Sequence, residues 1–110
     1  MRQTIRKHAD FLMPEDARKY ICDLFIARSR PTKWPGNAKY GLTATKRTFR
    51  HAVLRNRAKR LLRVWLRLNE HLLSPDLDYV FIARSAIQDT TLPIGLAQTA
   101  RALEKLKAKG

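Results

Sequence analysis

The sequence predicts one small α+β domain in which a small mixed sheet packs against helices, in the order α-β-β-α-β-α. Three observations lead to this class: two short apolar segments on either side of a Pro- and Gly-containing loop, a long segment of helical periodicity, and an apolar run followed by a second periodic segment. A chain of 110 residues has room for one domain and one modest core. We therefore expect residues 1–110 to form a single domain, with residues 1–9 and 108–110 flexible.

The first half of the chain predicts a short helix and two strands. Pro14, followed by two acidic residues, is typical of the first turn of a short helix or of a break after an earlier one. Residues 20–27 are apolar apart from Asp23 and predict a strand. Residues 30–37 hold two prolines and a glycine and predict a loop. Residues 40–45 are β-prone, so we expect them to be the hairpin partner of the first strand.

Residues 50–73 predict an amphipathic helix. At about 100° per residue, six apolar side chains lie within roughly 40° of one line: Leu54, Ala58, Leu61, Trp65, Leu68 and Leu72. The opposite side holds Asn56, Lys59, Arg60, Arg63 and Arg67, with Arg55 and Arg57 on the flanks. The helix should therefore have one core face and one strongly cationic face.

The second half of the chain predicts one more strand and one more helix. Ser74 and Pro75 end the amphipathic helix. Residues 79–83 are continuously apolar, as expected of a strand that is covered on both sides or nearly so. Pro93 opens a final helix whose apolar residues have helical spacing: Leu96, Ala100, Leu103 and Leu106.

Positive charge is concentrated in one part of the chain. The formal net charge is +14, and residues 24–69 hold thirteen Lys or Arg residues and no acidic residue. Nine of these basic residues lie within residues 46–67. Arg60, Arg63 and Arg67 repel one another at helical spacing, with no Glu to relieve them. We therefore expect this surface to bind a polyanion.

The basic residues favour the phosphates of a structured RNA. Arginine outnumbers lysine between residues 24 and 69, and its planar guanidinium pairs two phosphate oxygens where lysine offers a point charge. RNA is favoured over DNA because no helix-turn-helix pair or zinc-finger pattern is present. The basic segment lacks the face segregation of a membrane-surface helix, and no apolar run approaches a membrane span. Since no apolar stretch follows the charged N-terminus, we expect no secretory signal and a cytoplasmic location.

The sequence predicts no catalytic and no metal-binding residues. His8, His51 and His71 are far apart and lie in no catalytic motif, whereas a protein ribonuclease needs paired acid and base groups or a carboxylate cluster. Asp76 and Asp78 are interpreted as part of a helix-to-strand turn. Cys22 is the single cysteine, which excludes an internal disulfide and a multi-cysteine zinc site. We expect Trp65 in the core, and Trp34 either as a stacking contact or as a packing anchor.

Two stretches resemble a known family. Residues 40–47, Tyr-Gly-Leu-Thr-Ala-Thr-Lys-Arg, and residues 52–63, Ala-Val-Leu-Arg-Asn-Arg-Ala-Lys-Arg-Leu-Leu-Arg, closely resemble the signature of the bacterial ribonuclease P protein subunit. In that family a strand that ends in a basic pair leads into a helix with an Arg-Asn-Arg motif followed by Lys-Arg. Residues 9–11, residues 78–84 and the closing helix extend the resemblance over essentially the whole chain.

The resemblance implies the ribonuclease P protein-like fold and a role in tRNA maturation. A member of this family is the small subunit of a ribonucleoprotein endonuclease that removes the 5′ leader from precursor tRNA. The catalytic RNA subunit would hold most of the Mg²⁺ and cleave the bond, and the protein alone would not cleave. With the charge pattern, the resemblance gives these RNA-binding residues: Lys46, Arg47, Arg50, Arg55, Asn56, Arg57, Lys59, Arg60, Arg63 and Arg67.

The resemblance also implies a cleft for the single-stranded leader. Phe11 matches an aromatic residue that lines this cleft, and Ile21 or Phe25 on the facing strand would complete it, because unstacked bases pack on aromatic and apolar side chains. Alternatively, Phe11 pins the N-terminal segment to the sheet. The chain departs from the family at Glu15, where members often have a second aromatic residue, and in residues 48–51, which lack the glycine of many members.

Two other functions are compatible with the composition. One is a structured-RNA-binding protein with no enzyme attached, such as a ribosomal protein. The other is a freestanding nuclease. Stimulation of precursor cleavage only in the presence of a catalytic RNA separates the three.

Overall fold

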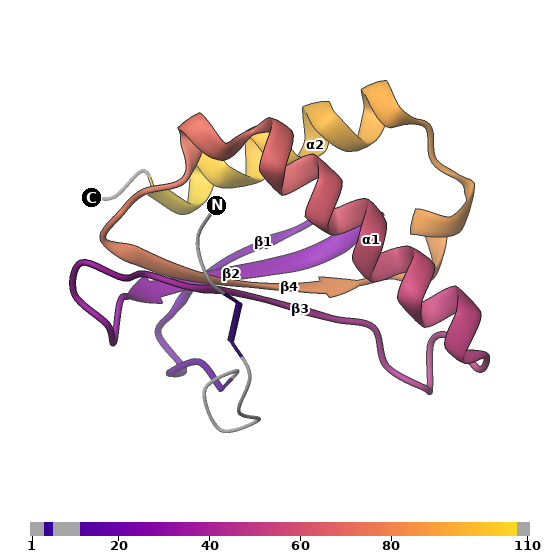
Figure 1. Cartoon of the computed structure of the whole chain (residues 1–110), viewed down its shortest axis with the longest axis horizontal. Helices are drawn as coiled ribbons and strands as arrows, with labels where there is room; N and C mark the ends of the chain where they lie inside the picture. The colour runs from indigo at the N-terminus through magenta and orange to yellow at the C-terminus, as the bar shows by residue number, and fades with distance from the viewer. Residues whose placement is uncertain (1–3, 6–11, 108–110) are drawn as a thin grey trace.

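The computed structural model describes residues 4, 5 and 12–107. They form a four-stranded sheet with two α-helices on one of its faces, as Figure 1 shows. The strands are β1 (Arg18–Ile21), β2 (Phe25–Pro31), β3 (Tyr40–Thr43) and β4 (Leu77–Ala83). The helices are α1 (Ala52–Leu68) and α2 (Leu92–Lys107), with short 3-10 segments η2 (Glu70–Leu72) and η3 (Ser85–Asp89) after α1 and β4. The predicted α+β class with a mixed sheet is confirmed, while the expected flexible ends fall almost entirely outside the described residues.

The strand pairing differs from the prediction. The sheet has the order β1-β2-β4-β3, with antiparallel β1–β2 and β2–β4 pairs and a parallel β3–β4 pair. The predicted hairpin between residues 20–27 and 40–45 is therefore wrong, because β4 lies between β2 and β3. A parallel pair needs a long crossover connection, and α1 supplies it between β3 and β4.

The chain before residue 28 also folds differently from the prediction. Residues 20–27 are not one strand, because residues 22–24 form a turn in which the Cys22 amide donates to the Phe25 carbonyl oxygen at 3.1 Å. Asp23, the polar residue of this stretch, is exposed at the turn. The short helix expected at Pro14 is absent from the described residues. The Ala17 amide instead donates to the Pro14 carbonyl oxygen at 3.0 Å, and β1 begins at the next residue.

The hydrophobic core lies between the sheet and the helices. Alternate strand residues face the helices, and Phe25, Ala27, Tyr79 and Phe81 are fully buried there. The Phe25 and Phe81 rings have centroids 5.1 Å apart and planes tilted by 59°, an arrangement that aromatic quadrupoles favour. This row of large side chains gives α1 and α2 the apolar surface on which they pack.

The two helices contact each other through the buried Trp65. A Cβ atom built on Gly95 of α2 would stand 2.2–2.7 Å from atoms of the Trp65 ring, so only glycine allows this approach. The side-chain amide of Asn69, just after α1, donates to the Trp65 carbonyl oxygen at 3.0 Å and to the Leu96 carbonyl oxygen at 3.3 Å. The prediction that Trp65 lies in the core is confirmed.

Within the described residues, the other face of the sheet carries no helix, and we call it the helix-free face. The strand residues that alternate with the core residues lie on it: Lys19, Ile21, Ile26, Arg28, Arg30, Gly41, Thr43, Asp78, Val80 and Ile82. Val80 is buried and Ile82 half-buried, so the expectation of a nearly covered β4 is correct. Thr4 and Ile5 pair beside β3, where the Ile5 amide donates to the Tyr40 carbonyl oxygen at 2.7 Å. Within the described residues, no helix is long and apolar enough to cross a membrane.

Candidate nucleic-acid interface

Helix α1 has a buried side and a basic side, as predicted, but the buried side is rotated. Its buried residues are Ala58, Leu62, Trp65 and Leu66. At 100° per residue, the mean direction of these four side chains around the helix axis lies roughly 60° from the mean direction of the six predicted core residues. Leu68, which was predicted in the core, is 52% exposed, and Leu54 and Leu61 are only half-buried. The rotation follows from packing, because α1 contacts α2 as well as strands β3 and β4.

The exposed side of α1 carries basic groups without protein partners. Its exposed polar residues are Asn56, Arg57, Arg60, Arg63 and Arg67, and Lys59 beside them is half-buried. Within the described part of the chain, the guanidinium groups of the four arginines form no hydrogen bond or ion pair with another residue. No acidic residue occurs anywhere between residues 24 and 69. These guanidinium groups are therefore available to an external anion.

The loop that leads into α1 adds three more cations. Lys46, Arg47 and Arg50 are exposed, and Phe49 between them is fully buried and anchors the loop to the core. Arg55 behaves differently from its neighbours: its Nη1 donates to the carbonyl oxygens of Phe49 at 3.0 Å and of Arg50 at 3.2 Å. Arg55 therefore fixes the shape of the loop as well as adding charge.

The N-terminus of α1 contributes positive potential at the same place. His51 occupies the position before the first helical residue and makes no side-chain capping hydrogen bond, and the first turn holds no acidic residue. The unpaired amides of a helix start carry a partial positive charge. We call the loop cations and the exposed side of α1 the cationic surface: Lys46, Arg47, Arg50, Arg55, Asn56, Arg57, Lys59, Arg60, Arg63 and Arg67.

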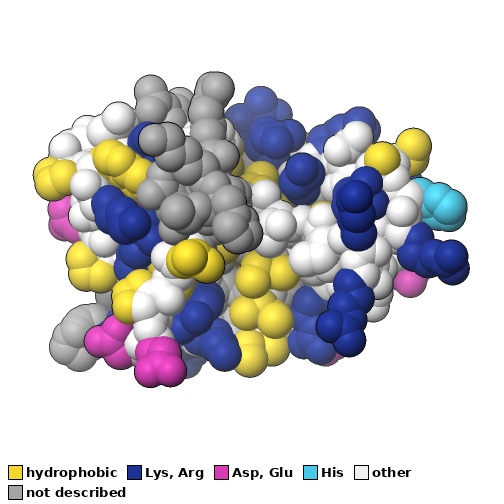
Figure 2. Space-filling view, turned by 90° about the horizontal axis from the view of Figure 1, so that it is seen from below, with side chains coloured by type: hydrophobic (Ala, Val, Ile, Leu, Met, Phe, Trp, Pro, Cys, Tyr) yellow, Lys and Arg dark blue, Asp and Glu magenta, His cyan; other side chains and the backbone are white. Residues whose placement is uncertain are grey.

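An apolar row crosses the helix-free face next to this loop. Strand register places Ile21, Ile26, Ile82 and Thr43 side by side across all four strands. Ile21 is 55% exposed, and Ile26 and Ile82 are half-buried. Figure 2, which looks onto this side of the molecule, shows an apolar strip with basic side chains on both sides of it. Because β3 ends at Thr43, the row adjoins the loop of the cationic surface.

Of the two predicted cleft residues that the structure describes, Ile21 lies on this row and Phe25 does not. Phe25 is fully buried among the core residues under the helices, so the prediction that it lines a surface cleft is wrong. The cause is strand alternation, since Ile26, the next residue, is the one that shares a face with Ile21. Phe11 lies outside the described residues.

The sequence reasoning missed several residues beside the row. Ile26 and Ile82 belong to the row itself. Lys19 and Arg28 face each other two residues further along the β1–β2 pair, and Arg84 follows the end of β4. The Nη1 atom of Arg84 donates to the Cys22 carbonyl oxygen at 3.0 Å, which places it at the turn beside Ile21. Alternation along β2 would have found Ile26 and Arg28, provided that the turn at residues 22–24 had been recognised.

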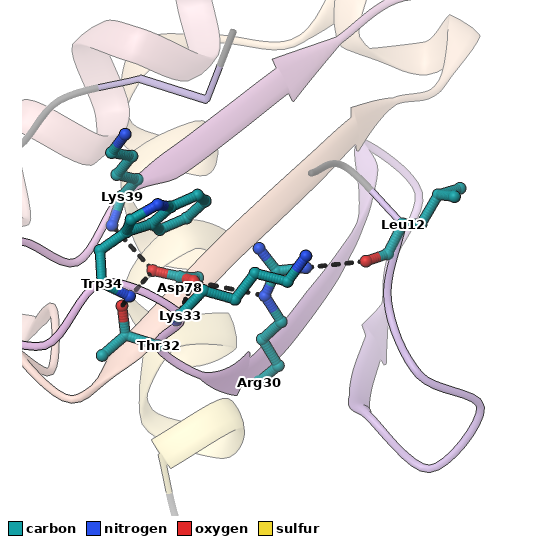
Figure 3. A network of polar contacts seen from close by, with 7 residues as sticks. All are labelled: Leu12, Arg30, Thr32, Lys33, Trp34, Lys39 and Asp78. Atoms are coloured by element: carbon teal, nitrogen blue, oxygen red, sulfur yellow. Dashed lines mark hydrogen bonds and ion pairs between the residues drawn. The ribbon is translucent and has the colours of Figure 1, made fainter. Parts of the chain in front are cut away.

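Asp78, which was interpreted as part of a helix-to-strand turn, lies in β4 and is the centre of a network of polar contacts (Figure 3). Asp78 is fully buried and accepts hydrogen bonds from Thr32 Oγ1 at 2.7 Å, from the amides of Lys39 and Lys33 at 2.9 and 3.0 Å, and from Arg30 Nε at 3.3 Å. Burial by itself would raise the pKa of Asp78, but these hydrogen bonds outweigh it and hold the pKa below the ordinary value. Asp78 therefore closes the loop of residues 32–39 onto the sheet.

Trp34 belongs to the same loop and is half-buried. The Lys39 Nζ atom stands 4.3 Å from the ring centroid, and the Arg30 guanidinium carbon stands 5.7 Å from it. Both are within the range of cation–π attraction. Of the two roles predicted for Trp34, the structure supports that of a packing anchor.

Groups for protein-based catalysis do not come together among the described residues. His51 and His71 are exposed at opposite ends of the α1–η2 segment, and His8 lies outside the described residues. Asp76 is exposed in the turn before β4, while Asp78 is used by the loop network. No group of three or more His, Cys, Asp or Glu side chains in the described part could hold a metal ion.

The fold and its surface together define a class of protein: a small α+β domain with a helix of exposed arginines beside an apolar row on its sheet. The model of the Ribonuclease P family matches residues 1–107 of the chain. The chain thus belongs to the ribonuclease P protein family, and curated members named as ribonuclease P protein components are its relatives.

Individual relatives agree with this assignment. Over 71 residues the chain is 39% identical to the ribonuclease P protein components of Cronobacter sakazakii and of Escherichia coli K12, an alignment that covers 64% of this chain and 56% of each relative. Among solved structures, the RNase P protein of Staphylococcus aureus has a TM-score of 0.79 at 23% identity, covering 97% of both chains. That of Thermotoga maritima has a TM-score of 0.71 at 19% identity, covering 99% of this chain and 100% of the other. These structures show that the fold is shared.

Proposed function

We propose that this chain is the protein subunit of a ribonuclease P ribonucleoprotein, an endoribonuclease that removes the 5′ leader of precursor tRNA. The observation that carries the proposal is the adjacency of two surfaces, one rich in unpaired guanidinium groups and one apolar. A folded RNA suits the first, and an unpaired RNA strand suits the second.

The cationic surface binds phosphates of the catalytic RNA subunit and of the substrate. Between Arg60, Arg63 and Arg67 the guanidinium groups repel one another, and binding of a polyanion offsets this repulsion. Each phosphate contact releases condensed counterions from the RNA, so affinity falls with salt. By placing positive charge between two polyanions, the protein lowers the repulsion between catalytic RNA and precursor.

The apolar row receives the leader. Ile21, Ile26 and Ile82 offer a flat apolar floor at the surface, and Lys19 and Arg84 stand beside it for the phosphates of a strand that crosses the sheet. The family resemblance adds Phe11 as an aromatic contact for the leader. Contact with apolar side chains depends little on base identity, so leaders of different sequence are accepted.

Bond cleavage belongs to the RNA subunit. The described residues hold no carboxylate or histidine cluster that fits Mg²⁺, which supports this division of roles. Magnesium held by the RNA subunit supplies the chemistry of hydrolysis. The protein's part is to hold the leader so that the scissile phosphate stays at the RNA site.

The deciding experiment measures precursor tRNA cleavage at low Mg²⁺ with a bacterial catalytic RNA, with and without this chain. We expect the chain to stimulate cleavage only when the catalytic RNA is present. Binding without stimulation would identify a structured-RNA-binding protein such as a ribosomal protein. Cleavage by the chain without RNA would identify a freestanding nuclease.

A further inference from the structure

Arg28 lies on the helix-free face and donates to the segment of residues 12–17. Its Nη2 atom stands 3.2 Å from the Ala17 carbonyl oxygen, 3.3 Å from that of Pro14 and 3.4 Å from that of Glu15. Three carbonyl groups of one turn thus converge on a single guanidinium nitrogen. Although Arg28 belongs to the basic part of the sequence, its charge is directed at the protein's own backbone.

Arg30 holds the same segment from the next position on that face. Its Nη1 atom donates to the Leu12 carbonyl oxygen at 2.7 Å, while its Nε atom is paired with Asp78. Arg30 is only 4% exposed, so this hydrogen bond is sheltered from water. Two arginines on alternate positions of β2 therefore bind both ends of the segment.

The segment lies largely at the surface. Leu12 is 63% exposed, and Pro14, Glu15 and Asp16 are exposed as well. Behind the segment lies a cavity of about 570 Å³ between it, the end of β2, the turn before β4 and the end of α2. Within the described part of the chain, the side-chain hydrogen bonds to this segment come from Arg28 and Arg30, and we infer that its position depends on them.

The segment stands next to the apolar row. Arg28 follows Ile26 by two residues on the same face of β2, a spacing of about 7 Å along a strand. The turn that Arg28 holds therefore borders the part of the helix-free face that carries Ile26 and Ile21.

We propose that Arg28 is a positioning residue for leader binding, which holds residues 12–17 at a fixed distance from the apolar row. Arg30 supports it at the Leu12 end. The inference rests on the proposed function, because it assigns a role within the same leader site. If residues 12–17 are already held in place before the leader binds, less conformational entropy is lost on binding.

The experiment compares Arg28→Ala with Lys19→Ala. Lys19 faces Arg28 across the β1–β2 pair and is exposed, so its removal takes the same charge from the same face without touching residues 12–17. Arg28→Gln is the second variant, since it keeps the side-chain stem and a neutral donor that is too short for the three carbonyls. Amide hydrogen exchange of residues 12–17 is measured on the free protein. Affinity is measured on the holoenzyme with precursors that carry a long leader or a one-nucleotide leader.

In both Arg28 variants we expect faster exchange in residues 12–17 and a roughly tenfold loss of affinity for the long-leader precursor, with affinity for the short-leader precursor retained. In Lys19→Ala the exchange should stay as in the wild type and the leader-dependent loss should be smaller. Unchanged exchange in the Arg28 variants overturns the inference. So does an equal loss for both precursors, or exchange of residues 12–17 that is as fast in Lys19→Ala as in Arg28→Ala.

The wild-type holoenzyme tests the proposed function separately. If it does not distinguish long from short leaders, the leader site itself is misassigned and the inference falls with it. If it does distinguish them and the Arg28 variants behave like the wild type, only the positioning role fails.

Discussion

The basic part of the sequence divides into two regions that use the same residue types in opposite ways. In residues 28–39, Arg28 and Arg30 donate to backbone carbonyls and to Asp78, and Lys39 stands over the ring of Trp34. In residues 46–67, most of the cations are exposed, and the four arginines on the outer side of α1 have no partner among the described residues.

The difference teaches that charge density alone does not identify a binding surface. A guanidinium group whose donors are satisfied within the protein contributes to the fold, as Arg30 does beside a buried carboxylate. A guanidinium group without a partner repels its neighbours and is available to an external anion. Variants of the first region should therefore act through the folded structure, by lowering stability or by releasing residues 12–17, and variants of the second should lower RNA affinity directly.

The largest effect is expected from Asp78→Ala. The substitution leaves Arg30, Thr32 and two loop amides without their common acceptor, and breaking a buried, hydrogen-bonded ion pair costs about 3–5 kcal/mol. Urea unfolding of the free protein measures the loss. A variant with wild-type stability would show that the loop is held by other contacts and would remove the contrast between the two regions.

Acid unfolding sharpens the same comparison. Because the pKa of Asp78 in the folded protein lies below its ordinary value of 3.8, its contribution to stability is fully present above about pH 4 and is lost as the pH falls through the folded pKa. The gap in melting temperature between the wild type and Asp78→Asn should therefore narrow below pH 4. A gap that is constant down to pH 2 contradicts this account.

The next effect concerns the buried side of α1. Leu62→Ala should cost roughly 2–5 kcal/mol, because it opens a cavity in the core, whereas Leu68→Ala at a half-exposed position should cost less than about 1 kcal/mol. Denaturant unfolding of the two matched variants measures the difference. Equal losses of stability would show that Leu68 belongs to the core, as the sequence predicted.

The double variant Arg60→Gln and Arg63→Gln should change RNA binding and leave the stability of the free protein nearly unchanged. Removing two phosphate contacts should lower the salt slope of binding to the catalytic RNA by about 1.4–1.8, and the melting temperature should not fall. Arg101→Gln, an exposed arginine on α2, is the matched control. If the control changes the slope as much as the double variant, the positive charge acts through the whole molecule and α1 is not the contact surface.

The smallest effect is expected from Arg63→Glu in the free protein. A glutamate at this position stands four residues before Arg67, an arrangement that stabilises a helix by about 0.2–0.5 kcal/mol, and it also removes a like-charge repulsion. Melting temperature at low salt should rise slightly, and the rise should shrink in high salt. The same variant should bind the catalytic RNA more weakly. A fall in melting temperature at low salt would mean that the exposed arginines of α1 do not strain the free fold.

Local patterns in the sequence determined several features of this protein. Helical spacing was sufficient to predict α1 and α2, since apolar residues recur every three or four positions in an amphipathic helix. The absence of acidic residues between 24 and 69 was sufficient to predict an exposed cationic helix. The motif around Arg55, Asn56 and Arg57 gave the family.

Tertiary structure decided the rest, because it depends on contacts between residues that are distant in sequence. β3 pairs with β4 and not with β2, since the α1 crossover brings residues 40 and 79 together. The core line of α1 is rotated because α2 packs beside it, a contact that no periodicity within α1 records. A turn at residues 22–24 moves Phe25 into the core and Ile26 to the surface, since one residue of register exchanges the faces of a strand. Arg28 looks like any other cation in the sequence, and only the folded chain brings three carbonyl oxygens to it.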